Sequence, residues 1–180
     1  MTKSKRLYES LTEEQFESVL KKAVRPIHKI CFILAYGAGL RISEIPALEK
    51  HDFDFERGTL FIRQAKSDKY RVVNIPRLFE QEHLAFIPIK LTERAIRKAF
   101  LTASLRAGVN TVLYTDASQR PRYRYKFHSL RQSYATRALE KGVPINELQA
   151  LLGHENLATT SMYTKANPMD AIASIMDKEV

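Results

Sequence analysis

The last third of the chain holds four side chains whose chemistry suits a reaction at phosphate: His128, Arg131, His154 and Tyr163. A guanidinium and two imidazoles can donate hydrogen bonds to phosphate oxygens and stabilise the charge that grows on them in a pentavalent transition state. A tyrosine hydroxyl can attack phosphorus and form a covalent intermediate. These residue types therefore suggest phosphate transfer with Tyr163 as the nucleophile.

Two cationic residues further upstream could complete such a site. Arg41 directly follows the apolar run Ile30–Leu40, which predicts a guanidinium at the end of a buried helix. Lys66 falls in the loop of a predicted hairpin. Taken singly, each is an ordinary surface cation, and His128 with Arg131 is an ordinary pair that shares one helix face.

Several common catalytic patterns are missing from the sequence. It has no glycine-rich phosphate loop, no Cys or His cluster at zinc spacing and no Gly-x-Ser-x-Gly elbow. Asp52 and Asp54 form the nearest approach to a carboxylate pair for metal binding, and we do not expect a metal there. The predicted chemistry therefore uses no cofactor and no metal.

The composition points to an anionic partner. The chain has 180 residues and a formal net charge of +9, and clustered lysines and arginines favour binding to a nucleic-acid backbone. No apolar run reaches the length of a membrane span, and Cys31 is the single cysteine, so no internal disulfide can form. We expect one soluble, cytoplasmic domain with no membrane contact and no small-molecule substrate.

The elements that would position these side chains are mostly helical. Capping residues, glycine stops and a helical apolar period predict five longer helices. They are expected at about 12–23, 26–39, 93–107, 128–142 and 144–153, with shorter ones after Ser43, around 159–163 and after Pro168. Alternating apolar residues between Phe53 and Ile75 predict a small antiparallel sheet of three strands. The fold class is therefore α+β and mostly helical.

A second hairpin is predicted between Asn110 and Phe127. Tyrosines and a phenylalanine alternate there with Arg122, Arg124 and Lys126, which gives one aromatic and one basic face. The basic face is either a solvated surface or a contact with the DNA backbone.

Together, these segments resemble the successive signature motifs of the tyrosine recombinase, or phage integrase, family. The resemblance rests on Gly39-Leu40-Arg41-Ile42-Ser43-Glu44-Ile45, His128-Ser129-Leu130-Arg131, Leu151-Leu152-Gly153-His154, and Tyr163 nine residues later. It extends from about Leu11 to Ala173. The motifs are weak singly and specific in combination and in this order.

The resemblance implies a helix-rich catalytic domain with a small sheet that cleaves and rejoins double-stranded DNA. Tyr163 would form a 3′-phosphotyrosyl link, and Arg41 and Arg131 would hold the nonbridging oxygens. Lys66 would protonate the 5′-oxygen leaving group, with Lys69 as a nearby alternative. His128 would handle protons at the tyrosine, His154 would donate to the phosphate, and Glu44 would orient its neighbours.

The resemblance also frames the expected domain organisation. We expect a basic tail at 1–10, the catalytic domain at 11–167 and a helical tail at 168–180, without the N-terminal core-binding domain that family members usually have. The tail could dock on its own core or on another protomer of a DNA-bound dimer or tetramer. Gln132 stands where the family usually has a second histidine.

Two alternatives remain open on the sequence. A type IB topoisomerase would share the tyrosine and the cations but act as a monomer on one duplex. A DNA-binding module with an idle site would retain the fold without cleavage, although the intact set of six candidate residues argues against it.

Overall fold

The structure, a computed structural model, describes residues 9–63 and 70–153. Helices dominate this part of the chain, and the strands form two small antiparallel sheets. The elements in chain order are α1 (Glu13–Lys22), α2 (Pro26–Ala38), η1 (Ile45–Ala47), η2 (Lys50–Asp52), β1 (Phe53–Asp54), β2 (Thr59–Arg63), β3 (Tyr70–Asn74), η3 (Gln81–Phe86), α3 (Glu93–Arg106), β4 (Val112–Thr115), β5 (Pro121–Tyr123), α4 (Phe127–Glu140) and α5 (Ile145–Leu152).

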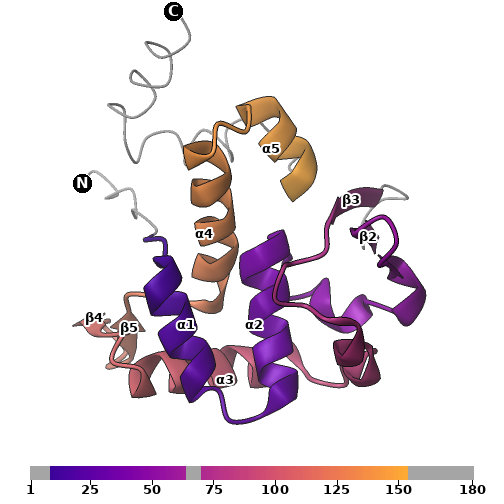
Figure 1. Cartoon of the computed structure of the whole chain (residues 1–180). Helices are drawn as coiled ribbons and strands as arrows, with labels where there is room; N and C mark the ends of the chain where they lie inside the picture. The colour runs from indigo at the N-terminus through magenta and orange to yellow at the C-terminus, as the bar shows by residue number, and fades with distance from the viewer. Residues whose placement is uncertain (1–8, 64–69, 154–180) are drawn as a thin grey trace, which may run out of the picture.

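Helix α2 is the centre of the core. It packs against α4 and α3, while α1 packs on α3 and α5 packs on α4. Figure 1 shows α3 crossing beneath α1 and α2, with α5 at the opposite end of α4. Phe32 of α2 meets Phe100 of α3 edge-to-face at a centroid separation of 5.6 Å, and Phe127 at the start of α4 joins the same group. This packing fixes the directions of α2 and α4.

The predicted helix ends are confirmed at several places. Thr12 caps α1 by accepting a 3.2 Å hydrogen bond from the Gln15 amide, and Gln15 accepts from the Thr12 amide in return. Gly39 and Gly153 end α2 and α5 in the left-handed conformation, with φ of 66° and 62°. At Gly39 a Cβ atom would also lie 2.6 Å from Tyr134 Cδ1, so both the backbone angle and the close packing require glycine.

The segment after Arg41 differs from the prediction. Ser43 was expected to cap a short α-helix, whereas the chain forms only the 3₁₀ turn η1, preceded by Glu44 and without a side-chain cap. The Glu44 carboxylate instead accepts hydrogen bonds from Arg41 and Arg71. Leu48, directly after the turn, is buried in the core.

The three-stranded antiparallel sheet is confirmed, in the order β1-β2-β3. In its register Leu60 pairs with Val73 and Ile62 pairs with Arg71. Arg71 and Val73 are buried while Val72 between them is exposed. The inward face of β3 thus carries an arginine among apolar residues.

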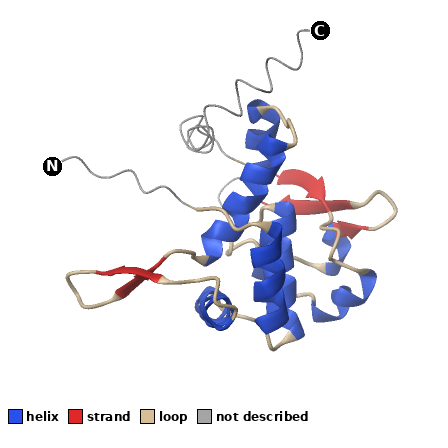
Figure 2. Cartoon of the chain, turned by 60° about the vertical axis from the view of Figure 1, so that its left-hand side comes forward, coloured by secondary structure: helices blue, strands red, loops and turns tan. Residues whose placement is uncertain are grey.

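The second hairpin is also confirmed, with corrected bounds. Strand β5 ends at Tyr123, and Phe127 already belongs to α4. Asn110 closes the base of the hairpin, because it donates to the Tyr125 carbonyl and accepts from the Tyr125 amide, each at 2.9 Å. Figure 2 shows this hairpin projecting on the side opposite the three-stranded sheet.

Three of the predicted segments lie outside the described residues. They are the loop 64–69, the short helix around 159–163 and the tail 168–180. Among the described helices, none has the length and apolar character needed to cross a bilayer.

Candidate active site

Arg131 lies at the meeting point of three helices. It extends from α4, is 1% exposed, and donates to the carbonyl oxygens of Gly39 at 2.5 Å and Leu152 at 2.6 Å. These carbonyls belong to the C-terminal ends of α2 and α5, where helical carbonyls lack intrahelical donors and favour cations. The ends of α2 and α5 therefore hold the Arg131 guanidinium in a fixed place.

Arg41 reaches the same end of α5 from the other side. Its guanidinium donates to the carbonyl oxygen of Gly153 at 2.8 Å and to Glu44 Oε1 at 2.8 Å. The Arg41 amide donates to Glu44 Oε2 at 2.7 Å, so the carboxylate fixes both the main chain and the side chain. The Arg41 side chain remains 36% exposed and is open to a ligand.

Glu44 also binds a third arginine, Arg71 of β3. The two terminal nitrogens of Arg71 donate to the two carboxylate oxygens of Glu44, each at 2.8 Å. Both side chains are buried. Burial by itself raises the pKa of Glu44, but the hydrogen bonds and charge of Arg71, together with the hydrogen bonds from Arg41, outweigh it and lower the pKa. The carboxylate is thus held ionised and can bind both arginines.

His128 lies in the first turn of the same helix as Arg131 and is exposed at the surface. Its pKa is lowered, first by partial desolvation of the imidazole and then by the positive charges of Arg131 and Arg41. The ring is therefore mostly neutral at neutral pH. A neutral imidazole can accept a proton, as general-base catalysis requires.

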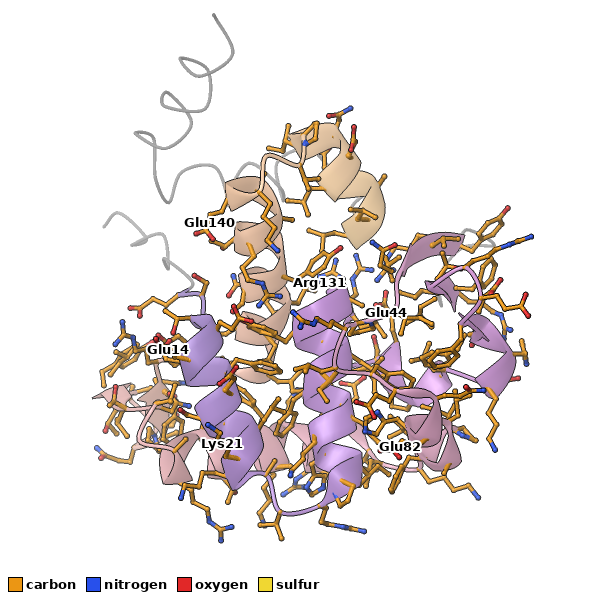
Figure 3. The ribbon with its side chains drawn as sticks, in the orientation of Figure 1. Glu14, Lys21, Glu44, Glu82, Arg131 and Glu140 are labelled. Carbon is orange, nitrogen blue, oxygen red and sulfur yellow. The ribbon has the colours of Figure 1, made fainter. Side chains whose placement is uncertain are left out.

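Glu44 binds two of the three arginines at this site. Arg41 and Arg71 share its carboxylate, so these three side chains carry a net charge of +1. Figure 3 shows Glu44 and Arg131 in the region between α2, α5 and the three-stranded sheet. Within residues 9–63 and 70–153, no group of three or more His, Cys, Asp or Glu is placed to hold a metal. The arrangement suits a phosphate anion.

Of the six candidate residues, the structure brings together Arg41, His128 and Arg131. Lys66, His154 and Tyr163 lie outside the described residues. In sequence, His154 directly follows Gly153, whose carbonyl accepts from Arg41, and Lys66 falls between the residues of β2 and those of β3.

Two sequence observations take on a clearer meaning in the structure. Gln132 is buried on α4, so the residue that stands in place of the family's usual second histidine packs in the core.

Arg71 of β3 was not predicted as a site residue from the sequence. The sequence did contain one indication: Arg71 and Val73 are two residues apart on a strand and so face the same way, into the core. A charge there needs a partner, because an unpaired buried charge is costly.

The three basic residues of the second hairpin lie away from this cluster. Arg122 pairs with Asp116 and Arg124 pairs with Glu9. Both arginine side chains are still 43% exposed, and Lys126 is exposed beside α4. Their contact with DNA stays a prediction.

Known proteins share both the sequence and the fold. Residues 9–169 match the phage integrase family. The chain is 38% identical over 174 residues to the tyrosine recombinase XerA of Thermococcus onnurineus, an alignment that covers 89% of this chain and 59% of the relative. It thus spans about three-fifths of the length of that curated relative.

Solved structures give the same fold at lower identity. The catalytic domain of bacteriophage HP1 integrase superposes with a TM-score of 0.64 at 20% identity, covering 95% of each chain. A lambda integrase tetramer bound to a Holliday junction superposes with a TM-score of 0.63 at 20% identity, covering 89% of this chain and 49% of that one. Because the family match covers most of the chain and the observed fold agrees with it, this protein belongs to the phage integrase family of tyrosine recombinases.

Proposed function

We propose that this chain is the catalytic domain of a site-specific DNA recombinase that cleaves and rejoins strands through a 3′-phosphotyrosyl link at Tyr163. The observation that carries the proposal is the convergence of Arg41 and Arg131. These residues lie far apart in sequence, yet they donate to the adjacent carbonyls of Gly153 and Leu152. Two guanidiniums that converge on the end of α5 form a site for the oxygens of a scissile phosphate.

We take the chemical steps from the roles that the family resemblance implies for these residues. The Tyr163 oxygen attacks phosphorus, His128 accepts the phenol proton, and the bond from phosphorus to the 5′-oxygen breaks. Lys66 gives that oxygen its proton, while Arg41, Arg131 and His154 bind the nonbridging oxygens. The new phosphotyrosyl ester keeps the bond energy, so attack by a 5′-hydroxyl reverses the reaction without a nucleotide cofactor.

Recombination is favoured over relaxation of a single duplex because the curated relative is a tyrosine recombinase. We also propose that residues 11–167 form the catalytic domain and that the tail 168–180 docks on a neighbouring protomer of a DNA-bound dimer or tetramer. The solved lambda integrase tetramer on a Holliday junction supports this assembly. Truncation after Asn167 should abolish oligomers on DNA and keep strand cleavage; unchanged oligomers would contradict the role of the tail.

The test of the reaction is a nicked duplex from which the cleaved fragment diffuses away. The wild-type chain should form a protein–DNA adduct on the 3′-phosphate, visible on a denaturing gel, and Tyr163→Phe should form none. Tyr134 is the matched control, because it is a tyrosine that lies near Arg71 and Arg131 and whose pKa is raised by burial. Tyr134→Phe should keep the adduct. An adduct that survives Tyr163→Phe and disappears in Tyr134→Phe would overturn the assignment.

The role of Arg131 can be separated from simple DNA binding. Arg131→Ala should bind duplex DNA and lose cleavage by at least about 100-fold, the usual effect of removing a donor to a developing oxyanion. Equal losses of binding and cleavage would mean that Arg131 only holds the substrate.

A further inference from the structure

We propose that Arg71 is a positioning residue for the phosphate clamp, acting through Glu44 on Arg41. The proposal rests on the proposed function, since it gives Arg71 a part in the same cleavage reaction. The terminal nitrogens of Arg71 donate to Glu44, whereas Arg41 donates to Gly153 at the end of α5.

The first support is the geometry of the shared carboxylate. Glu44 Oε1 accepts from the side chains of Arg71 and Arg41, each at 2.8 Å. Glu44 Oε2 accepts from Arg71 at 2.8 Å and from the Arg41 amide at 2.7 Å. The planar fork of Arg71 therefore sets the plane of the carboxylate, and the carboxylate in turn orients the backbone and guanidinium of Arg41.

The second support is that Arg71, and not Arg41 alone, supplies the counter-charge of Glu44. Arg41 is partly exposed and must give hydrogen bonds to an incoming phosphate, while Glu44 is buried. A buried carboxylate with Arg41 as its sole partner would compete with the phosphate for that guanidinium, because an unpaired buried charge is costly. Arg71 is 6% exposed and remains bound to Glu44. It neutralises the carboxylate, so that Glu44 can orient Arg41 without competing with the phosphate for its charge.

The third support is the placement of Arg71 in the sheet. It pairs with Ile62 of β2 and faces inward with Val73, so pairing with β2 fixes its backbone. Arg63 on β2 offers a contrast, because its guanidinium binds Asp52 at 3.0 Å and is 53% exposed. Arg63 shares the sheet but does not contact Glu44 in the described structure, which makes it the matched control.

The experiment measures single-turnover cleavage of three nicked duplexes that differ at the scissile phosphate. The first carries an ordinary phosphate. The second carries a methylphosphonate, whose lost negative charge reduces the need for a cationic clamp. The third carries sulfur in place of the 5′-bridging oxygen, and its thiolate leaves without a proton donor. The panel separates clamp defects from leaving-group defects.

Arg71→Gln should cleave the ordinary phosphate about 100-fold more slowly, the size of effect expected when a clamp is displaced by about 1 Å. The deficit should shrink to less than about 10-fold on the methylphosphonate, because that substrate demands less charge stabilisation. It should persist on the sulfur substrate. Arg41→Ala should show the same pattern, and Arg71→Gln added to Arg41→Ala should cause little further loss, because the two residues act through one route.

Arg63→Gln should cleave all three substrates at wild-type rates. If Arg71→Gln unfolds at the assay temperature, Arg71→Lys takes its place. It keeps the charge, loses the bidentate geometry, and should show a smaller deficit with the same dependence on substrate.

The outcomes separate this proposal from the proposed function. An unreactive wild-type chain contradicts the proposed function, and this proposal falls with it. A reactive wild type with an equally reactive Arg71→Gln contradicts this proposal alone. Restoration of Arg71→Gln by the sulfur substrate would place Arg71 on the leaving-group side and also overturn it, as would an equal deficit on all three substrates.

Discussion

Arg131 donates a 2.6 Å hydrogen bond to the carbonyl oxygen of Leu152, which joins α4 to the C-terminal end of α5. The same guanidinium binds the last turn of α2 through the Gly39 carbonyl. A residue proposed to stabilise a transition state is therefore also a packing residue of the core. Substitutions around it should affect stability and cleavage together.

Replacement of Gly39 by alanine should lower both stability and cleavage. The added Cβ meets Tyr134 at 2.6 Å and Leu152 at 3.1 Å, and the φ of 66° disfavours alanine. We expect a loss of about 3 kcal/mol in the free energy of unfolding, from strain and overpacking together. Gly58→Ala is the control, because its φ is 65° and its Cβ meets nothing within 4 Å. It should cost about 1 kcal/mol and keep cleavage. Urea denaturation measures both values, and equal losses would contradict the packing argument.

The cleavage rate should fall at acid pH because of His128. Its pKa is lowered by desolvation and by Arg131 and Arg41, so the neutral, proton-accepting imidazole is lost only as the pH drops below the ordinary value of 6.5. Single-turnover rates between about pH 5 and pH 8 should show a plateau at neutral pH and a fall below it. His128→Gln should be slow and should lack this acid limb. His83→Gln, in which the lost ring had accepted a hydrogen bond from the Glu80 amide, should keep it.

Glu44 should make the fold sensitive to acid. Its pKa in the folded state lies below the reference value of 4.5, so its contribution to stability is fully present above pH 4.5 and is lost as the pH falls through the folded-state pKa. Glu44→Gln should remove this part of the acid dependence. It should also cost about 3 kcal/mol at neutral pH, because Arg71 stays buried without its counter-charge. Glu82 is exposed, so Glu82→Gln should change neither the acid dependence nor the stability at neutral pH. Midpoints of urea denaturation, measured across the acid range for each variant, test this prediction.

The basic face of the second hairpin should contribute to DNA binding. Replacement of Arg122, Arg124 and Lys126 by alanine removes three cations, and each lost phosphate contact should reduce the slope of log K against log salt by about 0.9. The control removes the same number of exposed cations from α3, at Arg94, Arg97 and Lys98. Equal changes in slope would mean that the hairpin contributes only through net charge.

Much of the helical fold could be predicted because its signals are local. Thr12 with Gln15, and Gly39 and Gly153 at helix ends, act within a few residues and appear where expected. The short segment after Arg41 was less predictable. Its conformation depends on Glu44, whose partner Arg71 lies 27 residues further along the chain.

The site was predictable to the extent that it follows family motifs. Arg41, His128 and Arg131 were expected together, and the structure brings them together. Arg71 could not be assigned from the pattern alone, because the alternation of β3 shows that its side chain faces inward and not which charge it meets. The acceptors for Arg131 are backbone carbonyls, which every residue has.

The 92-residue separation of Arg131 from Gly39 has a consequence for synthesis of the chain. Their hydrogen bond cannot form until α4 has left the ribosome and docked on α2. The second acceptor, Leu152, emerges 21 residues later than Arg131. Contacts of such long range are completed late, after the local helices have formed. The nascent chain therefore cannot hold both guanidiniums in place before Leu152 and Gly153 have emerged.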